Sequence, residues 1–146
     1  MSNPSKAKGT AAESAVVAYL RSRGWPHAER RALSGSQDRG DIAGVVGVTL
    51  EVKNCKAMDL AGWLREAHAE QANNGDHIGA VVAKRRGTTN PADWYALLTF
   101  RQLCDLLAAA GYRGQPTPCA DCGLPTWNGL HADGHRDCLI RDGVPA

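Results

Sequence analysis

Residues 40–53 read Gly-Asp-Ile-Ala-Gly-Val-Val-Gly-Val-Thr-Leu-Glu-Val-Lys, and their pattern is the strongest indication of the fold. Apolar and polar residues alternate on both sides of residues 45–47, which is typical of two half-buried β-strands. Gly47 marks the turn between them. The apolar members of the alternation are Ile42, Val48, Leu50 and Val52. The stretch therefore predicts a β-hairpin with one apolar face.

The hairpin also predicts where its charged residues lie. A three-residue loop at 45–47 pairs Gly44 with Val48 and sets Asp41 opposite Glu51. Directly opposed residues on one face have Cβ atoms about 5 Å apart. Lys53 lies two residues after Glu51 and so shares its face. We predict two carboxylates and one ammonium group clustered on the face opposite the apolar one.

The flanking segments supply the other elements of the fold. We predict helices over 10–24, 59–74 and 99–111, and further strands over 27–33, 78–83 and 94–98. A mixed sheet flanked by helices buries such a pattern, so the predicted class is α/β. Residues 1–9 are predicted to be a disordered basic arm. The core domain then covers 10–112, with a linker at 113–118 and a separate tail at 119–142.

Composition limits the function. The chain has 146 residues with a net charge of +2, and residues 1–115 are mildly basic while residues 116–146 are acidic. No apolar run is long enough for a membrane span, and no signal peptide opens the chain. We therefore expect no membrane partner and a cytoplasmic location, in a bacterial or archaeal cell or a phage-infected host.

The charged cluster indicates a metal site. Two close carboxylates repel each other unless a cation lies between them. Mg²⁺, or Mn²⁺, prefers hard oxygen ligands, so Asp41, Glu51 and the backbone carbonyl of Val52 are the predicted ligands. Such an ion polarises a phosphate and activates bound water. Lys53 would orient or deprotonate that water, or stabilise charge on the phosphoryl group.

These motifs resemble the PD-(D/E)xK nucleases, and most of all the small archaeal and phage-type Holliday-junction resolvases. The likeness covers roughly residues 8–110, although Gly40 stands where the signature has Pro. It implies a restriction-endonuclease-like core of αβββαβ order, a homodimer, and Mg²⁺-dependent hydrolysis of DNA at four-way junctions or other branched structures. Asp41, Glu51 and Lys53 would be catalytic.

The resemblance adds three positions outside the hairpin. Glu13 matches an acidic residue of the first helix that completes the metal shell, although its spacing from Thr10 is also that of a helix-capping box. Ser34 or Ser36 matches a loop serine near the scissile phosphate.

Clustered cations predict contacts with a nucleic-acid backbone. Lys84, Arg85 and Arg86 follow the predicted strand at 78–83, and Arg39 precedes the hairpin. Because no segment is suited to reading bases, we expect recognition of DNA shape.

The tail carries a second metal motif. Cys119 and Cys122 form a C-x₂-C pair, and His135 and Cys138 form an H-x₂-C pair, with His131 as the alternative to His135. Four such ligands suit a structural, tetrahedral Zn²⁺ ion. We therefore predict a small zinc-knuckle-like tail whose folding depends on the metal.

Two other functions compete with junction resolution. The first is a restriction-like, repair or nicking nuclease on another DNA structure. The second is a non-catalytic, zinc-containing DNA-binding protein, which the charged set Asp41, Glu51 and Lys53 argues against.

Overall fold

The computed structural model describes residues 4–31, 39–112 and 114, with short strands at 117–118, 125–127 and 130–131. The chain divides into two compact units, Met1–Thr99 and Phe100–Ala146, and each is described by itself. Several predicted site residues lie outside the described residues: Ser34, Ser36, Cys119, Cys122, His135 and Cys138, with the side chain of His131.

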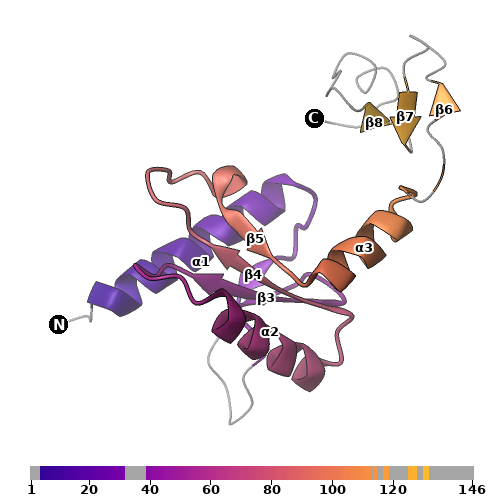
Figure 1. Cartoon of the computed structure of the whole chain (residues 1–146). Helices are drawn as coiled ribbons and strands as arrows, with labels where there is room; N and C mark the ends of the chain where they lie inside the picture. The colour runs from indigo at the N-terminus through magenta and orange to yellow at the C-terminus, as the bar shows by residue number, and fades with distance from the viewer. Residues whose placement is uncertain are drawn as a thin grey trace. The chain divides into compact units, whose positions relative to one another are not determined.

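The first unit is built on a five-stranded mixed sheet (Figure 1). Its order along the sheet follows the chain: β1 (Glu29–Arg30), β2 (Ile42–Ala43), β3 (Val48–Lys53), β4 (Ile78–Ala83) and β5 (Tyr95–Leu97). Strands β3 and β4 are parallel, and the other neighbours are antiparallel. With helices α1 (Pro4–Ser22) and α2 (Leu60–Asn74), and the short 3₁₀ helix η1 (Pro91–Asp93) before β5, the predicted α/β class and αβββαβ order are confirmed.

The predicted hairpin register is also confirmed. Ile42 of β2 pairs with Leu50 of β3, and extending this register by one residue sets Asp41 opposite Glu51. The backbone N–H of Asp41 donates to the carbonyl of Leu50 at 3.0 Å. Burial of Ile42 and Leu50 on one face selects this register, because a slip of one residue would turn both side chains to the other face.

Helix α1 begins earlier than predicted. It starts at Pro4, so the prediction of a disordered arm over 1–9 is wrong for residues 4–9. Proline suits the first helical position, because its φ is already helical and the N–H that it lacks would have no partner inside the helix. The capping pattern at Thr10 therefore lies inside the helix.

Helix α2 has the predicted ends. The Asp59 side chain accepts a hydrogen bond from the N–H of Gly62 at 2.9 Å, which caps the N-terminus. Gly75 ends the helix in the left-handed conformation, with φ of 70°.

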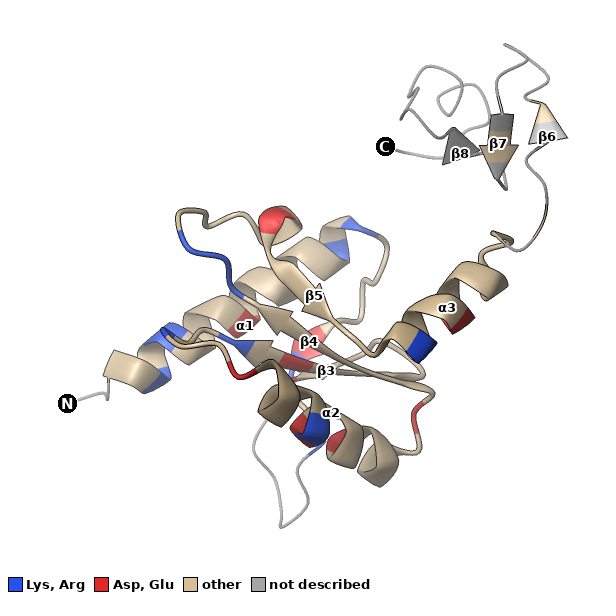
Figure 2. Ribbon diagram, viewed as in Figure 1, with Lys and Arg blue, Asp and Glu red and all other residues tan. Residues whose placement is uncertain are grey.

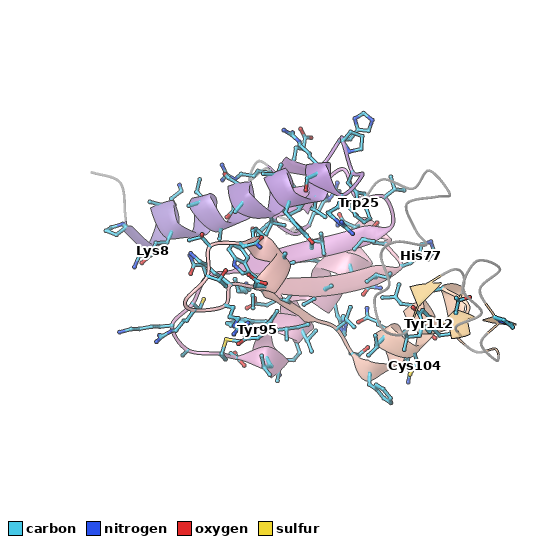
Figure 3. The ribbon with its side chains drawn as sticks, turned by 90° about the horizontal axis from the view of Figure 1, so that it is seen from above. Lys8, Trp25, His77, Tyr95, Cys104 and Tyr112 are labelled. Carbon is cyan, nitrogen blue, oxygen red and sulfur yellow. The ribbon has the colours of Figure 1, made fainter. Side chains whose placement is uncertain are left out.

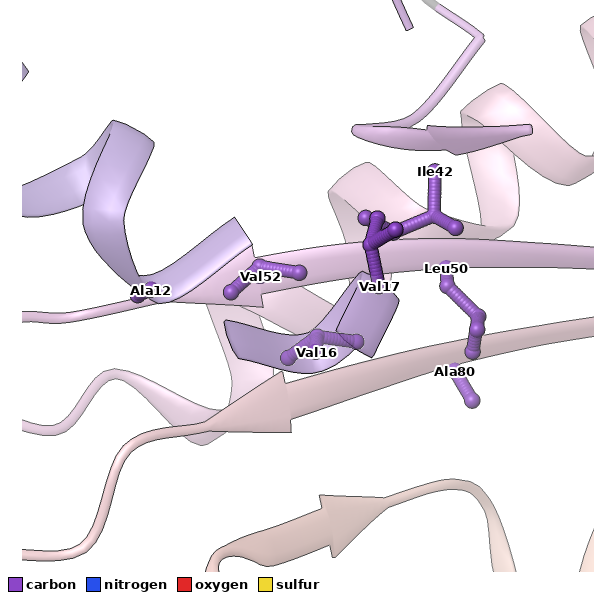
Figure 4. Close-up of a cluster of buried hydrophobic side chains, with 7 residues drawn as sticks. All are labelled: Ala12, Val16, Val17, Ile42, Leu50, Val52 and Ala80. Atoms are coloured by element: carbon purple, nitrogen blue, oxygen red, sulfur yellow. The ribbon is translucent and has the colours of Figure 1, made fainter. Parts of the chain in front are cut away.

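Two hydrophobic clusters cover the two faces of the sheet. On one face, Ala12, Val16 and Val17 of α1 pack with Ile42, Leu50, Val52 and Ala80 (Figure 4). On the other face, Trp63 and Ala67 of α2 pack with Val81 and Ala83. The central strand β3 is thus buried on both faces, which determines the environment of every side chain that it carries.

The second unit contains α3 (Phe100–Ala109) and a three-stranded antiparallel sheet of β6 (Thr117–Pro118), β7 (Pro125–Trp127) and β8 (Leu130–His131). The division falls before α3, not after it as predicted. The linker predicted at 113–118 is shorter as well, because residues 117–118 pair as β6. Within the described residues, no helix combines the length and the hydropathy that crossing a membrane requires.

Candidate active site

The charged residues of the hairpin lie on the face of the sheet that α2 covers. Side chains alternate along β3, so Leu50 and Val52 face α1 while Thr49, Glu51 and Lys53 face α2. Asp41 joins them from the start of β2, where its Oδ2 accepts the backbone N–H of Val52 at 2.7 Å. The structure therefore brings together Asp41, Glu51 and Lys53 as predicted.

Glu51 is buried, although the alternation placed it on the polar face of the predicted hairpin. Only 6% of the residue is exposed, because β3 is central and α2 covers its face. Its Oε2 is buried without a hydrogen-bond donor. Burial, contact with the Asp41 carboxyl and the charge of Asp41 together raise the pKa of Glu51 to about 10. A carboxylate in this position needs either a proton or a cation.

Lys53 is held between two carboxylates. Its Nζ lies 2.7 Å from Oε2 of Glu66 on α2 and 3.7 Å from Oε1 of Glu51. Partial burial works to lower the pKa of Lys53, but the hydrogen bond to Glu66 and the charge of Glu51 outweigh it and raise the pKa above its ordinary value. Lys53 is therefore a cation here, suited to stabilising negative charge.

Gly40 has a backbone conformation that proline, the residue expected here from the resemblance, does not adopt. Its φ is +85°, and a Cβ at this position would lie 3.0 Å from Cγ2 of Thr49 and 3.1 Å from the Leu50 carbonyl. Proline cannot adopt this φ, so the signature residue would not fit here. Glycine lets the chain approach β3 closely and place Asp41 beside Val52.

The end of α2 holds the same segment. Nδ2 of Asn74 lies 2.8 Å from both the carbonyl of Arg39 and Oγ1 of Thr49. Thr49 in turn donates to Asp76 at 2.6 Å. These bonds tie the residues before Asp41 to the strand that carries Glu51.

Glu70 is a site residue that sequence reasoning missed. It is 5% exposed on α2, it contributes to the raised pKa of Glu51, and its Oε2 would lie 3.6 Å from a Cβ at Gly40. A signal was present, because Glu70 follows Trp63 and Ala67 at helical spacing and so belongs to the buried face of α2. Gln71, its neighbour, instead donates to the carbonyls of Asp76 and His77.

The structure places Glu13 apart from these acids. Glu13 lies on α1, which packs on the other face of the sheet, and its Oε2 is 2.7 Å from Nε of Arg30. Its assignment to a metal shell stays a prediction.

The oxygen donors of the site suit a hard divalent cation. The orphaned Oε2 of Glu51 and the Asp41 carboxylate are close together. The carbonyl of Val52 points to the same strand edge as its N–H, which Asp41 accepts. Among the described residues, no three acidic, His or Cys side chains are placed to ligate one ion by themselves. Mg²⁺ usually retains several waters, so two carboxylates and a carbonyl fit it.

The predicted basic residues lie beside the site. Lys84 follows β4, and its N–H donates to the carbonyl of Lys53 at 2.8 Å, which continues the pairing of β4 with β3. Arg85 and Arg86 come directly after it and are exposed, as is Arg39, which precedes Gly40. Figure 2 shows basic residues gathered at the ends of β3 and β4 and in the first turns of α1, while acidic residues lie on β3 and α2.

Comparison with protein-family models, with curated proteins and with solved structures finds no match to this chain.

Proposed function

We propose that the protein is a metal-dependent DNA endonuclease of the PD-(D/E)xK type. One observation carries the proposal. The buried Glu51 carboxylate, with Oε2 lacking a donor, lies beside Asp41 and 3.7 Å from the Lys53 ammonium group. The αβββαβ order supports it, because the resemblance to these nucleases implies that order, and the hairpin register supports it, because it sets Asp41 opposite Glu51.

Each residue of the site has a part in this proposal. Asp41, Glu51 and the Val52 carbonyl would hold Mg²⁺ or Mn²⁺, which polarises the scissile phosphate and activates water. Lys53 would stabilise charge on the phosphoryl group, since its raised pKa favours the cation over a general base. Glu66 orients Lys53 through the 2.7 Å bond, and Asn74 holds the chain that leads to Asp41.

The finer proposal is a Holliday-junction resolvase with a restriction-endonuclease-like core that acts as a homodimer on four-way or other branched DNA. Its support is the resemblance of residues 8–110 to such enzymes. A cytoplasmic location follows from this function. The proposed place of Glu13 in the metal shell rests on the resemblance alone.

For the tail, we propose a structural Zn²⁺ ion held by Cys119, Cys122, His135 and Cys138, with His131 as the alternative to His135. Its support is the ligand spacing, together with the two paired strands β6 and β7, whose connection contains both residues of the C-x₂-C pair. Metal analysis of the purified chain should find about one zinc per chain.

Cleavage assays test the function. Four-way junctions, linear duplexes and flaps are incubated with the protein and Mg²⁺, with EDTA as the control. Paired symmetric cuts in the junction are expected. Cutting of duplexes or flaps alone would indicate the restriction-like or repair alternative, and binding without cutting would indicate the non-catalytic one.

A further inference from the structure

An open depression of about 940 Å³ lies beside Lys53 in the first unit. Three segments form its walls: the first turns of α1, residues 52–56 after the core of β3, and residues 84–89 after β4. We call it the basic groove. Six of its lining residues are cationic and none is acidic: Lys8, Lys53, Lys56, Lys84, Arg85 and Arg86.

Local contacts fix the walls of the basic groove. Asn54 donates from Nδ2 to the carbonyl of Lys8 at 3.2 Å, which joins α1 to the end of β3. Arg86 donates to the carbonyl of Lys56 at 3.3 Å, which joins the two strand-end segments. Nζ of Lys84 lies 5.6 Å from the centre of the Trp94 ring, a cation–π distance. These contacts hold the three segments, and the cations that they carry, in place around the groove.

The N-terminal turns of α1 also line the basic groove. Ser5, Lys8 and Gly9 belong to the first turns of α1, a helix of 19 residues. Figure 3 shows Lys8 near this end of α1, with Trp25 beyond its other end. The dipole of a helix N-terminus favours anions, and here it adds to the charge of the side chains.

We propose that the basic groove binds the sugar-phosphate backbone of one nucleic-acid strand, which runs from Lys53 to the N-terminal turns of α1. The proposal rests on the proposed nuclease function in one respect, that Lys53 faces the scissile phosphate. The other five cations would then contact neighbouring phosphates. A row of phosphates matches six cations distributed over three segments, whereas one small anion would not engage them all.

The sequence predicted backbone contacts for Lys84, Arg85 and Arg86, which are consecutive, whereas Lys8 and Lys56 join them from segments far away in the chain. Two of the three segments follow the carboxyl ends of parallel strands, which meet at one edge of the sheet. The start of α1 joins them only through the tertiary fold.

Salt-dependent binding tests the proposal without any cleavage. A fluorescent 20-nucleotide single strand and its duplex are titrated, in EDTA, with Glu51→Gln protein and with the triple variant Lys8→Gln/Lys56→Gln/Arg85→Gln on that background. Each lost phosphate contact should lower the magnitude of the slope of log K against log[salt] by about 0.7 for the single strand and about 0.9 for the duplex, so the triple variant should lose about 2.1 and about 2.7 respectively. Arg23→Gln, which neutralises an exposed cation outside the groove, is the control and should bind as its parent does.

A thiol footprint locates the strand. Cys55 lines the groove and is exposed, and Cys104 on α3 is an exposed cysteine that does not line it. Saturating oligonucleotide should slow alkylation of Cys55 several-fold, read by peptide mass spectrometry, and leave Cys104 unchanged. Inorganic phosphate at equal phosphate concentration should give little protection.

Two results would overturn the groove proposal: an unchanged salt slope in the triple variant, or full reactivity of Cys55 with oligonucleotide bound. Protection by polyglutamate but not by oligonucleotide would assign the groove to an acidic protein instead. Since no assay here needs catalysis, a protein that binds as expected but cuts no DNA contradicts the nuclease function and leaves the groove in place.

Discussion

The site on β3 has an acidic end around Glu51, where the charged groups are buried, and a basic end beyond Lys53, where they are exposed. Around Asp41, Glu51 and Glu70, carboxylates gather where water is scarce, and the pKa of Glu51 rises in response. Beyond Lys53, cations line an open depression that solvent screens. Charge is costly when it is buried and inexpensive when it is exposed. The acidic end is therefore the one where a substitution should change chemistry and stability most.

The largest expected effect is on cleavage. Glu51→Gln should lower the rate of Mg²⁺-dependent DNA cleavage by at least about a thousand-fold, or roughly 4 kcal/mol of activation free energy, because it removes a metal ligand. Single-turnover assays on the preferred DNA structure measure this. Glu29→Gln, on the exposed strand β1, is the matched control and should cut normally. Normal cutting by Glu51→Gln would remove Glu51 from the active site.

The next effect is the pH dependence of metal binding. Because burial and Asp41 raise the pKa of Glu51 in the metal-free protein to about 10, the ion must displace a proton at neutral pH. The apparent affinity for Mn²⁺ should therefore rise with pH, by up to about tenfold per unit between pH 6 and pH 8. Titration calorimetry in two buffers of different ionisation enthalpy should also detect the released proton. A flat profile would mean that Glu51 is already ionised.

The same group makes a prediction about stability. Glu51 loses its proton near pH 4.5 in the unfolded chain but near pH 10 in the folded protein, so the free energy of unfolding falls as pH rises between these values. In EDTA at pH 8, Glu51→Gln should be more stable than the wild type by about 1 to 3 kcal/mol. Urea denaturation at pH 5 and pH 8 measures the difference, which should shrink at pH 5. Equal differences at both pH values would contradict the assignment.

A smaller effect is expected at Gly40. Gly40→Ala should lower the free energy of unfolding by about 1 to 2 kcal/mol, because an L-residue at φ of +85° is strained. Gly40→Pro, which introduces the residue that the nuclease signature has at this position, should be worse. Gly24→Ala is the control for φ alone, since φ is +104° there and a Cβ would meet nothing within 4 Å. If Gly40→Pro were as stable as the wild type, the observed approach of this segment to β3 would be wrong.

The smallest effect is expected at Glu13. Its partner Arg30 has 41% of its side chain exposed, so Glu13→Gln should cost less than about 1 kcal/mol of stability. Its effect on cleavage should be small beside that of Glu51→Gln. A loss of cleavage as deep as that of Glu51→Gln, with unchanged stability, would place Glu13 in the metal shell.

Local sequence patterns anticipated much of the first unit. The alternation around residues 45–47 predicted the register that pairs Ile42 with Leu50, because one face of the hairpin must be buried. The cap at Asp59 and the glycine at Gly75 predicted the ends of α2, because both act through neighbouring backbone groups. The start of α1 was missed, because the basic residues that precede Thr10 suggested an arm although they are compatible with a helix.

The sequence alone determined which side chains share a face of β3, since that depends only on the two-residue repeat of a strand and on which residues are apolar. Packing in three dimensions buries Glu51, brings Glu70 to it and Glu66 to Lys53 from α2, and lets α1 close the basic groove. These contacts join residues that are far apart in the chain. Burial and charge interaction depend on distance in space, which the packing of helices on the sheet sets and no local pattern encodes.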